Sequence, residues 1–197
     1  IMENTVDTLY QTALDTFANL LAQAKQSQDP EPTAMTVATV GRDGRPAART
    51  VLLKGHDERG FVFYTNFNSR KGQQLAINPQ AALLFHWKHL QDGVQVKIEG
   101  TVEPVTADEA DAYFASRPRG SQIGAWASLQ SQPLASRELF DQRVLEFEQK
   151  YDGVAVPRPP HWLQVRRTER NPCWNAISPR PLQMEHVVKP SSGSAPW

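Results

Sequence analysis

The sequence has very little cysteine and no excess of charge of either sign. Its 197 residues include a single cysteine, Cys173, which cannot form an internal disulfide or a cysteine cluster for zinc. We therefore expect a protein of the reducing cytoplasm. The 21 basic and 21 acidic residues cancel, which argues against a nucleic-acid-binding protein that works through bulk charge.

Several other signals are missing. No apolar run approaches the roughly 20 residues of a membrane-spanning helix, and the N-terminus has no basic segment before an apolar core, so we expect neither a membrane anchor nor a secretory signal. No histidine pair has helical metal-ligand spacing with a third partner, so no metal site is expected. A glycine-rich phosphate loop and a nucleophile elbow are also absent from the sequence.

The patterns that are present predict a mainly β protein with flanking helices. Apolar residues at helical spacing predict a helix over 7–27, with an apolar face of Leu9, Ala13, Phe17, Leu20 and Leu21. Turn-forming residues divide 35–66 into three short strands, and further strands are expected at 81–87 and 94–105. Shorter helices are expected over 69–78, 106–115 and 136–151, the first two with Ser69 as N-cap and a capping box at Thr106. Together these elements suggest an antiparallel barrel of about six strands.

The stretch FYTNFNSRKGQQLAINP places two cations directly after a predicted strand. Arg70 and Lys71 stand at the start of the predicted helix, where the helix dipole makes cations mildly unfavourable. An anion bound at this end would explain them, and Tyr64 and Thr65 would add hydroxyl groups. A capped helix that merely carries surface cations is the equally weighted alternative.

Two other stretches could bind an anion. In ARTVLLK, Arg49 and Lys54 are five residues apart, so strict alternation places them on opposite strand faces. A shared ligand would have to wrap the strand end, or the strand would have to bend. In AYFASRPRGSQIGAW, Tyr113, Arg117 and Ser121 are spaced by four and share a face if the helix continues. The alternative for Arg49 and Lys54 is two solvated charges at the ends of the strand. The alternative for Arg117 is a cation at a helix C-terminus, where the helix dipole favours it.

In their order and spacing, RTVLLK, FYTN..SRK and YF.SRPR.SQIGAW..QS resemble the pyridoxine (pyridoxamine) 5′-phosphate oxidase family, from about Thr33 to Gln149. The resemblance implies an FMN-binding split β-barrel and a homodimer with FMN at each of two interface sites. It also implies an enzyme, pyridoxal 5′-phosphate synthase, that oxidises pyridoxine or pyridoxamine 5′-phosphate with O2 and releases H2O2. The expected partners are therefore small molecules and a second copy of the chain.

The resemblance also assigns roles to residues, but it names no catalytic one. The residues that match flavin contacts within one chain are Arg49, Thr50, Val51, Leu52, Leu53, Lys54, Tyr64, Thr65, Arg70, Lys71 and Gln95. Gln130 and Ser131 match flavin contacts supplied by the partner chain. The residues that match the substrate-phosphate site are Lys54, Tyr113, Arg117 and Ser121.

The resemblance divides the chain into a helix and linker (1–32), the FMN-binding barrel domain with its helices (33–160) and a divergent tail (161–197), whose end we expect to be disordered. In the tail, Trp174 matches a flavin contact and Arg180 a substrate contact, but a family histidine and a family arginine have no counterpart. Two explanations are open: translation out of frame after about Trp162, or divergence as in phenazine-biosynthesis relatives. Three functions follow: an active oxidase, a flavin- or pyridoxal-phosphate-binding protein with impaired turnover, or a flavin oxidase with another substrate.

Overall fold

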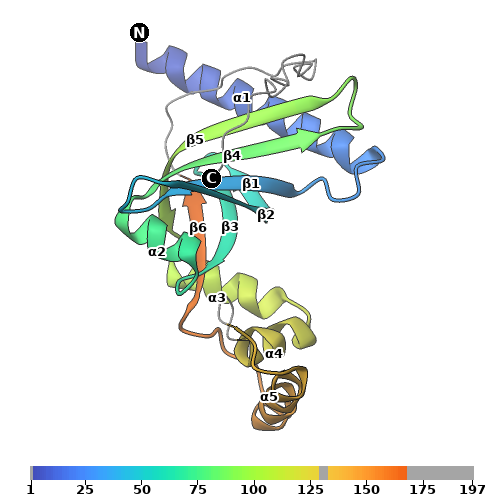
Figure 1. Cartoon of the computed structure of the whole chain (residues 1–197). Helices are drawn as coiled ribbons and strands as arrows, with labels where there is room; N and C mark the ends of the chain where they lie inside the picture. The colour runs from blue at the N-terminus through green and yellow to red at the C-terminus, as the bar shows by residue number, and fades with distance from the viewer. Residues whose placement is uncertain (1, 129–132, 168–197) are drawn as a thin grey trace, which may run out of the picture.

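The computed structural model of the chain describes residues 2–128 and 133–167. Its centre is a closed antiparallel barrel with the strand order β1-β2-β3-β6-β5-β4 (Figure 1). The strands are β1 (Ala34–Val40), β2 (Pro46–Asp57), β3 (Gly60–Asn66), β4 (Gln80–Trp87), β5 (Val94–Pro104) and β6 (Trp162–Arg167). The predicted antiparallel barrel with flanking helices is therefore confirmed.

Five helices accompany the barrel within the described part of the chain. They are α1 (Met2–Gln26), α2 (Arg70–Ile77), α3 (Ala107–Ser116), α4 (Arg119–Ala127) and α5 (Arg137–Lys150). Figure 1 shows α3, α4 and α5 gathered on the side of the barrel opposite α1. No helix among the described residues is long and apolar enough to cross a membrane.

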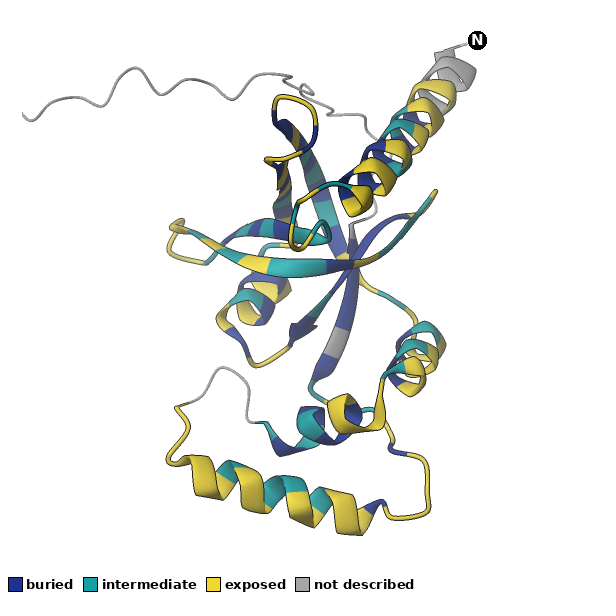
Figure 2. Ribbon diagram, turned by 90° about the vertical axis from the view of Figure 1, so that its right-hand side faces the viewer, coloured by how far each residue is buried: buried dark blue, intermediate teal, exposed yellow. Residues whose placement is uncertain are grey.

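The core forms inside the barrel because apolar side chains alternate along its strands. Phe61, Phe63 and Phe85 are fully buried there, and α1 adds Phe17, whose ring lies 4.9 Å from the ring of Phe61. The buried face of α1 differs in part from the prediction. Leu9 is 56% exposed, whereas its neighbour Tyr10 is buried, together with Leu14 and Ala24. Figure 2 shows this contrast, with an exposed outer face on α1 and a buried barrel interior.

The last strand, β6, extends the barrel beyond its expected boundary. It pairs with β3 on one side, Asn66 with Trp162, and with β5 on the other, Val102 with Arg167. The predicted domain boundary at residue 160 is therefore too early. The sequence did not signal this strand because two of its buried residues are polar: Gln164 and Arg166, on the face turned away from the barrel interior, are each only 8% exposed.

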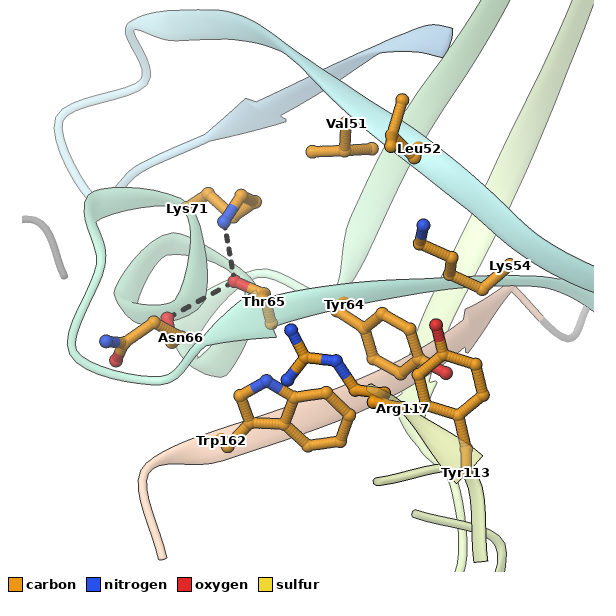
Figure 3. A pocket seen from close by; sticks show the side chains of 10 residues that line it. All are labelled: Val51, Leu52, Lys54, Tyr64, Thr65, Asn66, Lys71, Tyr113, Arg117 and Trp162. Atoms are coloured by element: carbon orange, nitrogen blue, oxygen red, sulfur yellow. Dashed lines mark hydrogen bonds between the residues drawn. The ribbon is translucent and has the colours of Figure 1, made fainter. Parts of the chain in front are cut away.

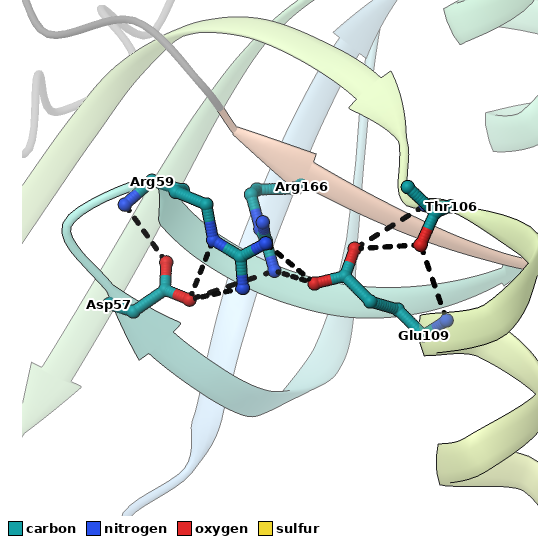
Figure 4. Close-up of polar contacts among 5 residues, drawn as sticks. All are labelled: Asp57, Arg59, Thr106, Glu109 and Arg166. Atoms are coloured by element: carbon teal, nitrogen blue, oxygen red, sulfur yellow. Dashed lines mark hydrogen bonds and ion pairs between the residues drawn. The ribbon is translucent and has the colours of Figure 1, made fainter.

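Ion pairs explain how Arg166 can be buried in β6 (Figure 4). Its Nη2 atom lies 3.1 Å from Oε1 of Glu109 in α3 and 3.8 Å from Oδ2 of Asp57 in β2. Arg59, in the turn between β2 and β3, contacts both carboxylates at 2.8 Å. A buried charge requires such compensation, and the four side chains join α3 to the barrel.

Candidate anion-binding site

A pocket of about 290 Å³ lies where β2, β3, the start of α2, the end of α3 and the start of β6 meet. Figure 3 shows its side chains converging from these five elements. The lining residues are Val51, Leu52, Lys54, Tyr64, Thr65, Asn66, Lys71, Tyr113, Arg117 and Trp162. Three of them are cations and none is a carboxylate, so the pocket is suited to an anion.

The start of α2 forms one wall of the pocket. Ser69 is its N-cap as predicted: its Oγ accepts a hydrogen bond of 3.1 Å from the Gly72 N–H and donates one of 2.6 Å to the Asn66 carbonyl. Lys71 Nζ donates to Thr65 Oγ1 at 2.8 Å. The turn is tight, because a Cβ on Gly72 would lie 2.5 Å from the Asn66 carbonyl oxygen. This close packing holds the ammonium group of Lys71 at the end of β3.

A cluster of positive charge surrounds this wall. Burial lowers the pKa of Lys71, and the nearby charge of Arg49 lowers it further. Burial also lowers the pKa of Arg49, with a smaller contribution from Arg70. Arg49 donates to Thr39 Oγ1 at 2.7 Å and to the Val37 carbonyl at 3.0 Å, but among the described residues none of these three cations pairs with a carboxylate. An anion bound here would relieve their mutual repulsion.

Aromatic rings form the opposite wall. Tyr64 lies 4.3 Å from Tyr113 and 4.5 Å from Trp162 between ring centres, and the guanidinium of Arg117 lies 5.4 Å from the Trp162 ring centre. Burial, followed by the neighbouring Tyr113, raises the pKa of Tyr64, so its phenol is neutral and can donate. The buried Tyr64 hydroxyl and Arg117 Nη1 have no hydrogen-bond partner within the described chain. Buried polar atoms of this kind usually have a partner, so both are available to a ligand.

The structure brings together many of the predicted site residues. The pocket lining includes eight of them: Val51, Leu52, Lys54, Tyr64, Thr65, Lys71, Tyr113 and Arg117. Four other predicted residues, Gln130, Ser131, Trp174 and Arg180, lie outside the described residues.

The remaining predicted residues do not line the pocket. Leu53 faces the core at 5% exposure, whereas Thr50 and Arg70 are exposed. Arg49 lies behind the pocket, hydrogen-bonded to β1. Gln95 is exposed on β5, opposite His86 of β4, because the alternation of β5 directs its neighbours Val94 and Val96 into the core.

Two expectations about local geometry have clear outcomes. The register of β2 against β3 shifts between Leu53 and Gly55, so β2 is irregular at Lys54, as a shared ligand for Arg49 and Lys54 would require. The helix carrying Tyr113 does not continue to Ser121. It ends at Ser116, and Arg117 is extended, with φ −74° and ψ 150°, because a residue that precedes proline avoids the helical conformation. Ser121 lies in the next helix, α4, and is exposed.

The predictions did not include two lining residues, Asn66 and Trp162. Asn66 ends β3, and the sequence marks it only as the point where the aromatic run stops. Trp162 begins β6 and reaches the pocket because β6 pairs with β3. A tryptophan directly after a proline-rich connector could have suggested a buried anchor, but only the strand pairing shows which residues it contacts.

A closed six-stranded barrel with flanking helices and a cationic pocket at its edge defines a split-barrel protein. The same fold occurs in a pyridoxamine 5′-phosphate oxidase-related, FMN-binding protein of Nostoc punctiforme, with a TM-score of 0.60, 17% identity and 78% of each chain covered. The sequence profile of the family described as pyridoxamine 5′-phosphate oxidase matches residues 21–151. This chain therefore belongs to the pyridoxamine 5′-phosphate oxidase family.

Individual relatives are similar over most of their length. The chain is 57% identical over 178 residues to the pyridoxine/pyridoxamine 5′-phosphate oxidase of Myxococcus xanthus, covering 90% of this chain and 85% of the relative. It is 61% identical over 155 residues to the protein of that name from Xanthomonas euvesicatoria, covering 78% of each. A solved structure of PhzG from Burkholderia lata, in complex with tetrahydrophenazine-1-carboxylic acid, has a TM-score of 0.67 and 31% identity, covering 82% of this chain and 74% of that one.

The Myxococcus match also bears on the tail. A match that covers 90% of 197 residues is longer than the 162 residues up to Trp162, so similarity continues past that point. The resemblance therefore extends beyond Gln149, where it was expected to end.

Proposed function

We propose that this protein is an FMN-dependent oxidase that converts pyridoxamine or pyridoxine 5′-phosphate to pyridoxal 5′-phosphate, with O2 as the electron acceptor and H2O2 as the product. Support comes from family membership, the names of relatives at 57% and 61% identity, and the pocket itself. The observation that carries most weight is that three cations and no carboxylate line the pocket. Both the proposed cofactor and the proposed substrates carry a phosphate, and such a pocket suits phosphates.

The residues present fit a bound FMN. Lys71 and Thr65 offer an ammonium group and a hydroxyl at the end of β3, hydrogen-bonded to each other at 2.8 Å. Arg49 and Arg70 add positive charge beside them, and no carboxylate of residues 2–128 or 133–167 pairs with either. We assign these four residues to the cofactor phosphate, and the strand Val51–Leu52 to the cofactor's surroundings. FMN, when bound, would supply the redox chemistry by accepting a hydride from the substrate and passing electrons to O2.

Arg117, Tyr113 and Lys54 would hold the substrate phosphate on the other side of the pocket. The Nη1 atom of Arg117 and the hydroxyl of Tyr64 are both buried without a hydrogen-bond partner in the part of the chain that the structure describes, so they are available to a ligand. Tyr64 stays protonated because burial raises its pKa, and it can therefore donate a hydrogen bond but not act as a base near neutral pH. The protein thus contributes by positioning the substrate, an effect that can be worth several kcal/mol of barrier.

A related flavin oxidase with another ring substrate is the second candidate, because PhzG has the same fold at 31% identity. The ligand of that structure carries a carboxylic acid instead of a phosphate, and a cationic pocket can bind either group. The purified protein, reconstituted with FMN, should be given pyridoxamine 5′-phosphate, pyridoxine 5′-phosphate and a reduced phenazine carboxylic acid in separate oxygen-electrode assays.

We expect a yellow protein that consumes O2 and forms H2O2 with the phosphorylated vitamers. O2 uptake with the phenazine alone would support the second candidate. A yellow protein that binds pyridoxal 5′-phosphate without forming H2O2 from either vitamer would instead indicate a binding protein with impaired turnover. Size-exclusion chromatography with light scattering should show a homodimer, the assembly in which Gln130 and Ser131 would reach the partner's FMN.

A further inference from the structure

Arg158 lies outside the pocket but joins two of the elements that line it. It stands in the proline-rich connector that precedes β6, and its side chain is 20% exposed. Its Nε donates to Asp111 Oδ1 at 2.5 Å, and its Nη1 donates to the backbone carbonyl of Trp162 at 3.0 Å. Asp111 belongs to α3 and Trp162 begins β6, so a single guanidinium group connects the two elements that supply the aromatic wall and Arg117.

Arg117 depends on Trp162 for its position. Its guanidinium lies 5.4 Å from the Trp162 ring centre and 5.6 Å from that of Phe114. It makes no ion pair within the described chain, and its Nη1 has no hydrogen-bond partner there. Cation–π contacts are only weakly directional compared with a bidentate ion pair. A shift of the indole therefore moves the surface on which Arg117 rests.

We infer that Arg158 is a positioning residue for phosphate recognition, acting through Trp162 and α3 on Arg117. This inference rests on the proposed function for the identity of the substrate. Arg158 is not among the residues that line the pocket, so it acts on the ligand only through its neighbours.

The chemistry of arginine suits this role. Its planar fork directs two donors to two acceptors at once, whereas a lysine ammonium is a point charge on a flexible stem. The ion pair with Asp111 adds little stability by itself, because that carboxylate side chain is 58% exposed and exposed pairs are weak. The main consequence of losing Arg158 should therefore be displaced geometry at the pocket.

The test compares Arg158→Met, Arg158→Lys and Asp111→Asn in the FMN-loaded protein. The matched control is Arg119→Met, because Arg119 also donates two hydrogen bonds, to the backbone carbonyls of Tyr151 at 2.6 Å and Val154 at 3.1 Å, but joins segments that do not line the pocket. We expect Arg158→Met to raise the KM for pyridoxamine 5′-phosphate about ten-fold, with kcat and FMN content unchanged, since small displacements from the productive geometry are costly. Arg158→Lys and Asp111→Asn should raise KM less, and Arg119→Met should leave KM unchanged.

Two results would overturn the inference: an unchanged KM in Arg158→Met, or an equal rise of KM in Arg119→Met, which would indicate general loosening. If Arg158→Met does not fold, as judged by thermal unfolding, the two milder variants decide by the same criterion. Absence of turnover in the unmodified protein would refute the proposed function instead. The affinity for inorganic phosphate, measured calorimetrically in the same variants, would then decide the inference: a weaker affinity in Arg158→Met than in Arg119→Met supports it, and equal affinities refute it.

Discussion

Replacing Lys71 by methionine should affect cofactor binding and the stability of the free protein in different ways. The side chain lines the pocket, and we assign it to the FMN phosphate. A hydrogen bond to a charged group contributes about 1.5–3 kcal/mol, so Lys71→Met should weaken FMN binding roughly 10- to 150-fold. Fluorescence titration of the flavin gives the dissociation constant directly.

The free protein should lose little stability in the same variant. Burial and the charge of Arg49 lower the pKa of Lys71, which means that the charged form is unfavourable in the folded state. Methionine removes that repulsion and keeps most of the buried stem. Thr65 loses the ammonium donor, but its hydroxyl still lies 3.2 Å from the Asn66 carbonyl and 3.3 Å from Ser69 Oγ. Thermal unfolding without FMN should therefore change little.

The pH dependence follows from the same pKa. In the free protein Lys71 loses its proton at a lower pH than an ordinary lysine, and the neutral amine cannot pair with phosphate. FMN affinity should therefore be full below this lowered pKa and fall as the pH rises through it. Lys71→Arg should shift the fall to higher pH, because arginine stays protonated. The matched control is Lys88→Met, which removes an exposed cation that does not line the pocket. Equal loss of FMN affinity in Lys88→Met and Lys71→Met, or no loss in either, would refute this reasoning.

Three further predictions concern stability and substrate binding. Gly72→Ala should lower the free energy of unfolding by about 1–3 kcal/mol through overpacking, since its Cβ would meet a backbone oxygen at 2.5 Å. Gly124→Ala is the control, because its Cβ meets nothing within 4 Å, and it should not lower the melting temperature. Equal melting temperatures in the two variants would show that the backbone adjusts. Arg117→Ala should raise the KM for pyridoxamine 5′-phosphate while FMN stays bound, and release of the flavin would mean that Arg117 serves the cofactor phosphate. Burial alone would raise the pKa of Glu109, but the hydrogen bond and charge of Arg166 lower this pKa overall. The ionised Glu109 therefore stabilises the fold above the ordinary pKa of a glutamate, and this stabilisation declines as the pH falls through the lowered pKa. Acid titration of unfolding should accordingly be shallower in Glu109→Gln, and an identical titration would exclude this contribution.

Local chemistry made several elements predictable. Ser69 and Thr106 cap their helices as expected, because a side-chain oxygen satisfies N–H groups that the helix itself leaves free. The strands from 34 to 104 follow from alternation and from turn-forming residues, both of which are local signals. The helix end at Arg117 was equally visible, since Pro118 follows it. The predicted helix ended at Ala115 accordingly, and a face shared with Ser121 was expected only if the helix continued.

The sixth strand was not predictable in the same way. Gln164 and Arg166 are buried in β6 on the face turned away from the barrel interior, and a buried arginine is tolerated only because Glu109 and Asp57 reach it from other elements. Those partners are distant in the sequence, so no local pattern reveals that the segment is a strand. The contribution of Trp162 to the pocket was hidden for the same reason.

The sequence by itself determined the strands and the helix caps of the barrel region. It also supplied a set of cations within motifs whose order along the chain is specific. Short-range rules of alternation, capping and turn formation suffice for these features, because each involves residues only a few positions apart. Only the tertiary structure decided which cations meet. It placed Lys54, Lys71 and Arg117 around one cavity and left Gln95 and Ser121 outside it. That selection depends on strand register, a bulge and a helix break, which together set the direction of each side chain in space.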